Sequence, residues 1–149
     1  MSNVNHELKS IFIHIPKCAG SSMECSRSTL GKGNGHTTLQ SYSEIEEFSS
    51  YYKWCFVRNP WDRAVSAWDT CPELKSAGVN TFEKFINILY NERHKIQNRP
   101  SIQWTKSGFI KISALPVQRI HWFPMLPMMK VNGEMVMDFV GRFENIKND

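Results

Sequence analysis

The sequence predicts an α/β fold built on a mainly parallel sheet. Two segments carry this prediction, residues 11–22 (IFIHIPKCAGSS) and residues 56–68 (FVRNPWDRAVSAW). Each runs from an apolar strand into a tight turn and then into the start of a helix, with a basic residue at the turn. Because the carboxyl ends of neighbouring parallel strands meet at one edge of a sheet, two such turns side by side would bind a ligand with anionic groups at two ends.

The first segment begins as a strand that we expect to be buried on both faces, because isoleucine and phenylalanine dominate residues 11–15. Pro16 ends it, since proline has no amide to donate to a neighbouring strand. Small residues follow, whose backbone amides can approach an anion: Ala19, Gly20, Ser21 and Ser22. Lys17 adds a mobile charge at the expected helix N-terminus. The Walker A pattern is absent, and an ordinary turn with a solvated lysine is the alternative.

The second segment repeats this arrangement one strand later. Residues 53–57 are predicted as a strand, and Arg58 follows at its carboxyl end. Asn59 is expected to cap a helix whose first residue is Pro60. An apolar stripe on this helix is expected to pack on the sheet as core rather than to stack on a ligand. The stripe consists of Trp61, Ala64, Val65 and Trp68.

Three polar residues of the second segment have competing roles. Ser66 lies off the apolar stripe and can face the same cleft as Arg58. Arg58 could instead form a salt bridge to Asp62 or to a distant carboxylate. Arg63 could be surface decoration paired with an aspartate.

Composition and charge agree with one globular domain over residues 1–149. The hydrophobic share of 41% and the charged share of 21% are ordinary for a folded chain of this length. A net charge of +4 suits an anionic ligand and would suit nucleic acid equally well. Without a run of basic residues or a nucleic-acid motif, we expect no nucleic-acid partner.

The cysteines indicate reduced thiols rather than a disulfide framework or a metal site. Their spacing excludes a CxxC zinc pattern, and they are Cys18, Cys25, Cys55 and Cys71. One lies in the first turn and another in a predicted buried strand, which is a poor layout for disulfides. The N-terminus is polar, and no stretch is long and apolar enough to span a membrane. We therefore expect a cytoplasmic chain without a metal.

The two segments resemble the two cofactor-binding signatures of the sulfotransferases that use 3′-phosphoadenosine-5′-phosphosulfate (PAPS). The resemblance is strongest to the carbohydrate sulfotransferases, which include the heparan/dermatan 2-O- and chondroitin enzymes. Residues 138–145 (DFVGRFEN) resemble a later segment of that family, and the three matches occur in family order. The resemblance implies a P-loop-like three-layer domain whose central sheet is flanked by helices. It also implies transfer of a sulfuryl group from PAPS to a hydroxyl acceptor, a carbohydrate.

The resemblance implies a role for each matching residue. Lys17 would hold the 5′-phosphosulfate and stabilise the leaving phosphate during catalysis. It would act together with the turn residues Cys18, Ala19, Gly20, Ser21 and Ser22. Arg58 and Ser66 would hold the 3′-phosphate, with Arg63 as a candidate helper. Cys18 and Ser21 stand where the family commonly has threonine, and a thiol is a weaker donor than a hydroxyl. The product would be 3′-phosphoadenosine-5′-phosphate (PAP).

Sulfuryl transfer also needs a base for the acceptor hydroxyl, and histidine suits this task near neutral pH. The candidates are His6, His14, His36, His94 and His121. His36 follows a glycine-rich connector between the two turns and resembles the Gly-His that supplies the base in this family. His14 is expected to be buried structure in the first strand. His121 could be structural or could line the acceptor cleft.

The remaining segments complete the expected architecture. The capping-box pattern at residues 43–46 predicts a short helix, and Asn80 is expected to cap a second one. Residues 91–116 are polar and are predicted to be irregular, beside the acceptor cleft. Residues 131–134 have the signature of a two-residue hairpin, and residues 135–140 are predicted as the strand that leads into GRFEN.

Two other classes of function compete with this interpretation. One is a degenerate module that binds nucleotide without catalysis, and the other is a kinase, which the missing Walker A loop and magnesium carboxylate disfavour. Relatives usually continue beyond GRFEN, so elements missing there could impair binding of the acceptor or of adenine, or a partner subunit in a homo-oligomer could supply them. Animal relatives are typically anchored in the Golgi, and we expect that location only if this chain is a trimmed domain.

Overall fold

The computed structural model describes residues 3–25, 36–97, 121 and 123–148. The chain divides into two compact units, of which the first contains residues 1–59 and 124–149 and the second contains residues 60–123. Each unit is described by itself below. The expectation of one domain over residues 1–149 stays a prediction.

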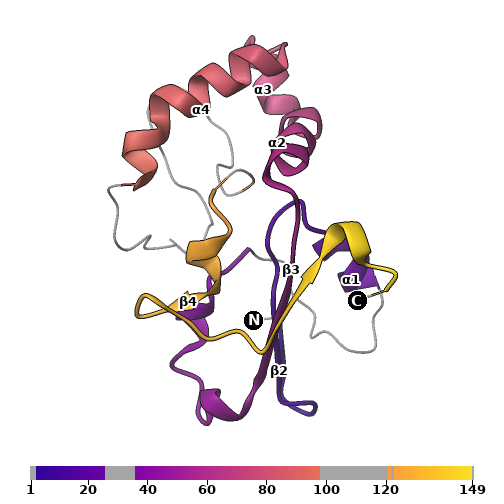
Figure 1. Cartoon of the computed structure of the whole chain (residues 1–149), viewed down its shortest axis with the longest axis vertical. Coiled ribbons are helices and arrows are strands. Elements are labelled where there is room, and N and C mark those ends of the chain that lie inside the picture. The colour runs from indigo at the N-terminus through magenta and orange to yellow at the C-terminus, as the bar shows by residue number, and fades with distance from the viewer. Residues whose placement is uncertain (1–2, 26–35, 98–120, 122, 149) are drawn as a thin grey trace. The chain divides into compact units, whose positions relative to one another are not determined.

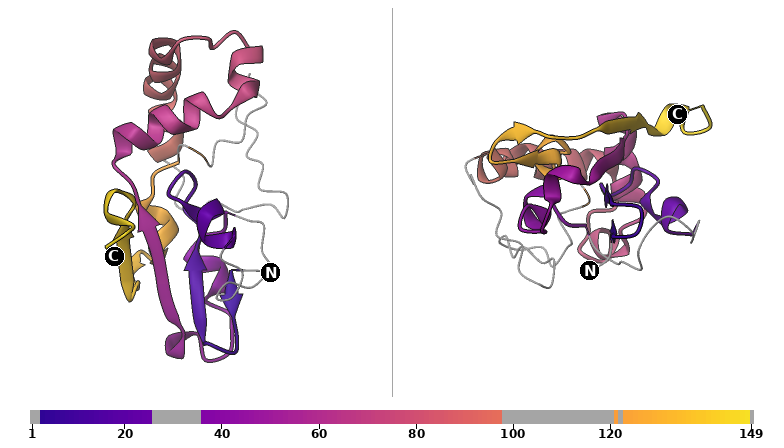
Figure 2. Two further views of the ribbon diagram at one scale, coloured as in Figure 1. Left: turned by 90° about the vertical axis from the view of Figure 1, so that its right-hand side faces the viewer. Right: turned by 90° about the horizontal axis from the view of Figure 1, so that it is seen from below.

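The first unit contains the sheet. Among the described residues, four strands form it in the order β1-β2-β3-β6 (Figures 1 and 2). The strands are β1 (Val4–Asn5), β2 (Ser10–Ile13), β3 (Tyr52–Val57) and β6 (Phe139–Arg142). β3 runs parallel to both of its neighbours, while β1 is antiparallel to β2. The predicted α/β class with a mainly parallel sheet is confirmed, and the three-layer, P-loop-like arrangement stays a prediction.

Burial explains why β2 forms where the sequence predicts a strand. Ile11, Phe12 and Ile13 are almost completely buried, as expected for an apolar strand with a neighbour on each side. The strand ends at Ile13, because the chain from Ile15 onward enters a turn closed by a hydrogen bond from the Cys18 amide to the Ile15 carbonyl (3.3 Å). On the other side of β3, Gly141 of β6 lies so close to Phe56 that a Cβ there would be 2.4 Å from the ring.

Short elements connect these strands within the first unit. They are α1 (Gly20–Cys25), η1 (Leu39–Tyr42), η2 (Phe48–Ser50), η4 (Leu126–Met129), β4 (Lys130–Val131), β5 (Glu134–Met135) and η5 (Phe143–Asn145). The predicted hairpin is confirmed, since β4 pairs with β5 around Asn132 and Gly133, which both have positive φ. The single strand predicted over residues 135–140 is wrong, because β5 ends at Met135 and β6 begins only at Phe139.

The predicted capping box at residues 43–46 is also wrong. The Ser43 hydroxyl donates to the Gln40 carbonyl three residues earlier (2.7 Å), so it ends η1 instead of starting a helix. Serine makes such local bonds to the backbone in either direction, and the residue pattern alone does not distinguish them.

The second unit is helical, with α2 (Pro60–Asp69), α3 (Pro72–Ser76) and α4 (Phe82–Gln97). Its core is a cluster of Cys71, Leu74, Val79 and Phe85. Ala64 and Trp68 of the predicted stripe pack against this cluster. The other two stripe residues were predicted wrongly as core, since Trp61 is 74% exposed and Val65 is 45% exposed.

Two predictions for α4 need correction. Its cap is Thr81, whose hydroxyl accepts from the Lys84 amide (3.3 Å), whereas Asn80 accepts from the Lys84 ammonium group (3.1 Å). The irregular segment predicted over residues 91–116 is wrong for residues 91–97, which continue the helix; residues 98–116 lie outside the described residues. No helix within the described ranges is long and apolar enough to cross a membrane.

Candidate functional site

The two basic turns lie side by side at the carboxyl ends of β2 and β3. The strands are parallel neighbours, with Ile13 opposite Cys55, so the turns that follow them leave the sheet at the same edge. A hydrogen bond joins the turns, from Nη1 of Arg58 to the carbonyl of Lys17 (3.4 Å). The predicted juxtaposition of the two turns is therefore present in the structure.

The Lys17 turn has an unusual backbone. Pro16 and Lys17 occupy its two central positions, and Lys17 has φ +66°, as the third residue of a type II turn requires. Ala19 follows with φ +68°. Two residues with side chains thus adopt the left-handed region, which costs about 1–2 kcal/mol each relative to glycine. Backbone strain of this kind is concentrated at functional sites.

The same turn leaves backbone donors without protein acceptors. The amides of Ser22 and Met23 both donate to the Ala19 carbonyl, and the Cys18 amide closes the turn. Among the described hydrogen bonds, the amides of Ala19, Gly20 and Ser21 have no acceptor. The hydroxyl-bearing side chains of Ser21 and Ser22 are exposed beside them. Consecutive unsatisfied amides of this kind form a concave site for an anion.

The thiol of Cys18 is directed into the protein. It is 1% exposed, and its Sγ lies 3.6 Å from the Pro16 carbonyl and 3.8 Å from Sδ of Met125. Cys55 is buried nearby, 3.4 Å from Sδ of Met129, and burial together with the neighbouring Cys18 raises the pKa of its thiol to about 12. The Cys55 thiol is therefore a protonated core group, and the buried Cys18 side chain packs under the turn.

Arg58 is held by the GRFEN segment as well as by the Lys17 turn. Its guanidinium carbon lies 4.3 Å from the ring centroid of Phe143, in a cation–π contact. Its Nε is buried and has no hydrogen-bond partner in the part of the chain that the structure describes. A buried donor without an acceptor costs about 1–3 kcal/mol, so this group favours the arrival of an acceptor.

Glu144 holds the peptide that follows Arg58. Its Oε1 accepts from the Asn59 amide (2.7 Å). This amide lowers the pKa of the Glu144 carboxyl most strongly, followed by its own amide and the charges of Arg58 and Arg142. Among the described residues, Glu144 forms no ion pair with Arg58, so the salt bridge to a distant carboxylate that was considered for Arg58 is not made by Glu144. Sequence reasoning missed Phe143 and Glu144 as contacts of Arg58, although the motif GRFEN marked their segment.

Two of the histidines form a pair next to the Lys17 turn. His14 is buried, and a Cβ built on Gly20 would lie 1.9 Å from its ring, so the ring fills the space that only glycine leaves open. His36 packs on His14 with ring centroids 4.3 Å apart, and its Nδ1 lies 3.1 Å from the His14 carbonyl. His6 lies elsewhere, with Nδ1 2.6 Å from the Tyr51 hydroxyl.

The other predicted site residues belong to the second unit. Ser66 is half-buried on α2, and its carbonyl accepts from the Thr70 hydroxyl (2.7 Å). Arg63 is buried and donates to the Phe123 carbonyl (2.8 Å), so the alternative of surface decoration is wrong. His121 is half-buried in the same unit. The side chain of His94 lies outside the described residues.

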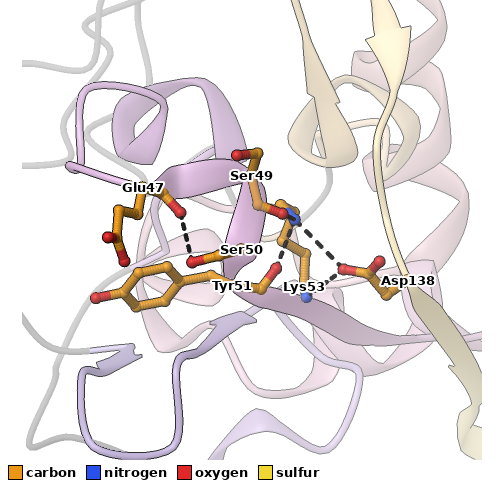
Figure 3. Close-up of polar contacts among 6 residues, drawn as sticks. All are labelled: Glu47, Ser49, Ser50, Tyr51, Lys53 and Asp138. Carbon is orange, nitrogen blue, oxygen red and sulfur yellow. Dashed lines mark hydrogen bonds and ion pairs between the residues drawn. The ribbon is translucent and has the colours of Figure 1, made fainter.

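The opposite end of β3 carries a different cation, Lys53 (Figure 3). Its ammonium group donates to the carbonyls of Tyr51 and Ser49 and lies 3.4 Å from Oδ2 of Asp138. The same carboxylate accepts from the Lys53 amide (2.7 Å). In the described ranges, no cluster of three or more histidine, cysteine or acidic side chains could hold a metal ion.

Comparison with known proteins identifies one family. The model of the sulfotransferase family matches residues 2–149, which is nearly the whole chain. No curated protein and no solved structure shows significant similarity to the sequence.

Proposed function

Because the chain belongs to the sulfotransferase family, we propose that its sulfuryl donor is PAPS and that its acceptor is the hydroxyl of a carbohydrate. One observation carries this proposal: two cationic turns lie side by side at the carboxyl ends of β2 and β3, joined by the bond from Arg58 to Lys17. A donor with phosphates at its 3′ and 5′ positions needs two such anion sites, whereas a donor with one phosphate group needs a single site.

The unsatisfied donors of the two turns fit the phosphates of this donor. At the first turn, we assign the 5′-phosphosulfate to Lys17 and to the amides of Ala19, Gly20 and Ser21, which have no acceptor among the described residues. The hydroxyls of Ser21 and Ser22 add two donors. Cys18 keeps this backbone in place through its buried thiol. When bound, PAPS supplies a sulfuryl group on a phosphate that can leave, and Lys17 provides the positive charge for that phosphate.

At the second turn, we assign the 3′-phosphate to Arg58, and the role expected for Ser66 stays a prediction. Nη1 of Arg58 donates to the Lys17 carbonyl, so we assign the phosphate to the edge formed by Nε and Nη2. That edge can bind two phosphate oxygens at once. The buried Nε without a partner is the feature that fits such an acceptor.

We propose His36 as the base. Since the His14 carbonyl can only accept, the 3.1 Å contact requires the proton of a neutral His36 to reside on Nδ1. The lone pair is then on Nε2, the nitrogen that would take the proton of the acceptor hydroxyl. The contact with the buried His14 ring fixes the orientation of this imidazole. The mechanism requires no metal.

Binding of PAP, compared with 5′-AMP, tests this proposal. We expect calorimetry to show at least tenfold tighter binding of PAP, because only PAP carries the phosphate assigned to Arg58. Equal affinities, or no binding of either nucleotide, would overturn the assignment of the donor.

The variant His36→Ala separates an enzyme from a binding module. Loss of sulfuryl transfer with unchanged PAP affinity is the expected result for a base. Unchanged turnover would remove His36 from the mechanism, and a wild-type protein that binds PAP but transfers no sulfate to any carbohydrate tested would favour the degenerate module. A cytoplasmic location and a homo-oligomer stay predictions.

A further inference from the structure

We propose that Phe143 and Glu144 are positioning residues that make Arg58 selective for a 3′-phosphate. This inference rests on the proposed function, because it assumes that Arg58 meets that phosphate. Both residues belong to η5, which directly follows β6. β6 pairs with β3 in a register that puts Arg142 opposite Val57, so η5 emerges beside the turn that carries Arg58.

Phe143 fixes the plane of the guanidinium group. With the guanidinium carbon 4.3 Å from the ring centroid, one face of the group is covered by the aromatic ring. Rotation about the last bonds of the arginine side chain would break this contact. The bond from Nη1 to the Lys17 carbonyl then fixes the direction within the plane. Together the two contacts hold the guanidinium group in one orientation.

Glu144 holds the backbone next to Arg58 in place. Its carboxylate accepts from the Asn59 amide at 2.7 Å, so the peptide that follows Arg58 is anchored to η5. Among the described residues, Glu144 forms no ion pair within 4.0 Å of Arg58. The positive charge of Arg58 is thus close enough to lower the pKa of the Glu144 carboxyl. Glu144 nevertheless does not use the hydrogen-bond donors of the guanidinium group, and we propose that these donors serve the ligand.

The variant Phe143→Leu tests the role of the ring. We expect its PAP dissociation constant to rise about fivefold, the equivalent of a cation–π contact, while the dissociation constant for 5′-AMP stays unchanged. Phe139→Leu is the matched control, since this ring lies in the preceding strand β6 and packs on Phe56 with centroids 6.1 Å apart. The control should keep the wild-type ratio of the two constants. Phe143→Tyr, which retains an aromatic face, should also keep it.

Glu144 provides a second test should the leucine variant fail to fold. Glu144→Gln retains an acceptor oxygen for the Asn59 amide and should keep the ratio of PAP to 5′-AMP affinities, whereas Glu144→Ala should lower it about threefold, as expected for one lost hydrogen bond. A wild-type protein without preference for PAP would overturn the proposed function itself. If the wild type prefers PAP, and the ratio of PAP to 5′-AMP affinities is the same as in wild type in folded Phe143→Leu or in Glu144→Ala, only the positioning role would be overturned.

Discussion

The two ends of β3 each carry a basic side chain, and the difference between them separates a structural cation from a candidate binding cation. At the amino end, Lys53 is 6% exposed and its ammonium group has two carbonyls and the Asp138 carboxylate as partners. At the carboxyl end, Arg58 has one long hydrogen bond, one ring contact and a buried Nε without a partner in the described chain. A cation whose donors all have partners stabilises the fold, whereas a cation with an unused donor favours the binding of a ligand.

The backbone is also well paired at the amino end of β3 and strained beside its carboxyl end. At the amino end, Lys53 and Asp138 exchange two hydrogen bonds, since the Lys53 amide donates to Oδ2 of Asp138 and the Asp138 amide donates to the Lys53 carbonyl (2.8 Å). Beside the carboxyl end, in the turn that follows the neighbouring strand β2, Lys17 and Ala19 have positive φ angles. Backbone strain is thus found beside the carboxyl end of β3, where the candidate site lies.

The largest effect on stability is expected at the close packing of the first turn. Gly20→Ala would place a Cβ 1.9 Å from the His14 ring, which must move, and we expect a loss of about 3 kcal/mol in the free energy of unfolding. Gly78→Ala is a control for glycine substitution in open space, where the positive φ of +80° costs about 1 kcal/mol. Urea denaturation of both variants measures the difference. A Gly20→Ala variant as stable as wild type would show that the turn is loosely packed.

Matched methionine substitutions test the contrast between the two cations. Lys53→Met leaves carbonyls and a carboxylate without their partner, so we expect it to lower the free energy of unfolding by about 2 kcal/mol. Arg58→Met removes one long bond and one unsatisfied donor, and its effect should stay within about 0.5 kcal/mol. Lys75→Met, which breaks an exposed pair with Asp69 at 3.6 Å, is the surface control. Equal losses at Lys53 and Arg58 would contradict the comparison.

Ala19→Gly should stabilise the protein. Glycine adopts φ +68° without the steric cost that alanine has, which predicts a gain of about 1 kcal/mol, less the entropy that glycine adds to the unfolded chain. Differential denaturation against wild type measures the gain. A loss of stability would mean that the turn is not strained at Ala19.

The smallest expected effect is the pH dependence that Glu144 contributes. Its pKa is lowered in the folded state from 4.5, so the contribution to stability is present above about pH 4.5 and is lost as the pH falls through the folded-state pKa. Glu144→Gln should therefore reduce the acid dependence of stability in that range and leave the neutral range nearly unchanged. Identical profiles of wild type and Glu144→Gln between pH 2 and 7 would argue against the contact with the Asn59 amide.

Local chemistry made much of this fold predictable. Apolar runs located β2 and β3, and the small residues after Pro16 marked the turn. The end of β2 was predicted too late, since the strand ends at Ile13 and not at Pro16. The contacts of Phe143 and Glu144 with the Arg58 turn were not predictable, because a pairing over 85 residues depends on the register of β6 with β3. Hydrophobic periodicity likewise predicted an apolar stripe on α2, but it does not show which part of the stripe is covered. Trp61 of this stripe is exposed.

The central claim is that the carboxyl end of β3 holds a 3′-phosphate through Arg58. Calorimetric titration of wild type and Arg58→Met with PAP and with 5′-AMP tests it most directly. The predicted result is at least tenfold tighter binding of PAP by wild type, with loss of that preference in Arg58→Met and little change in 5′-AMP affinity. The same preference for PAP in both proteins would contradict the claim.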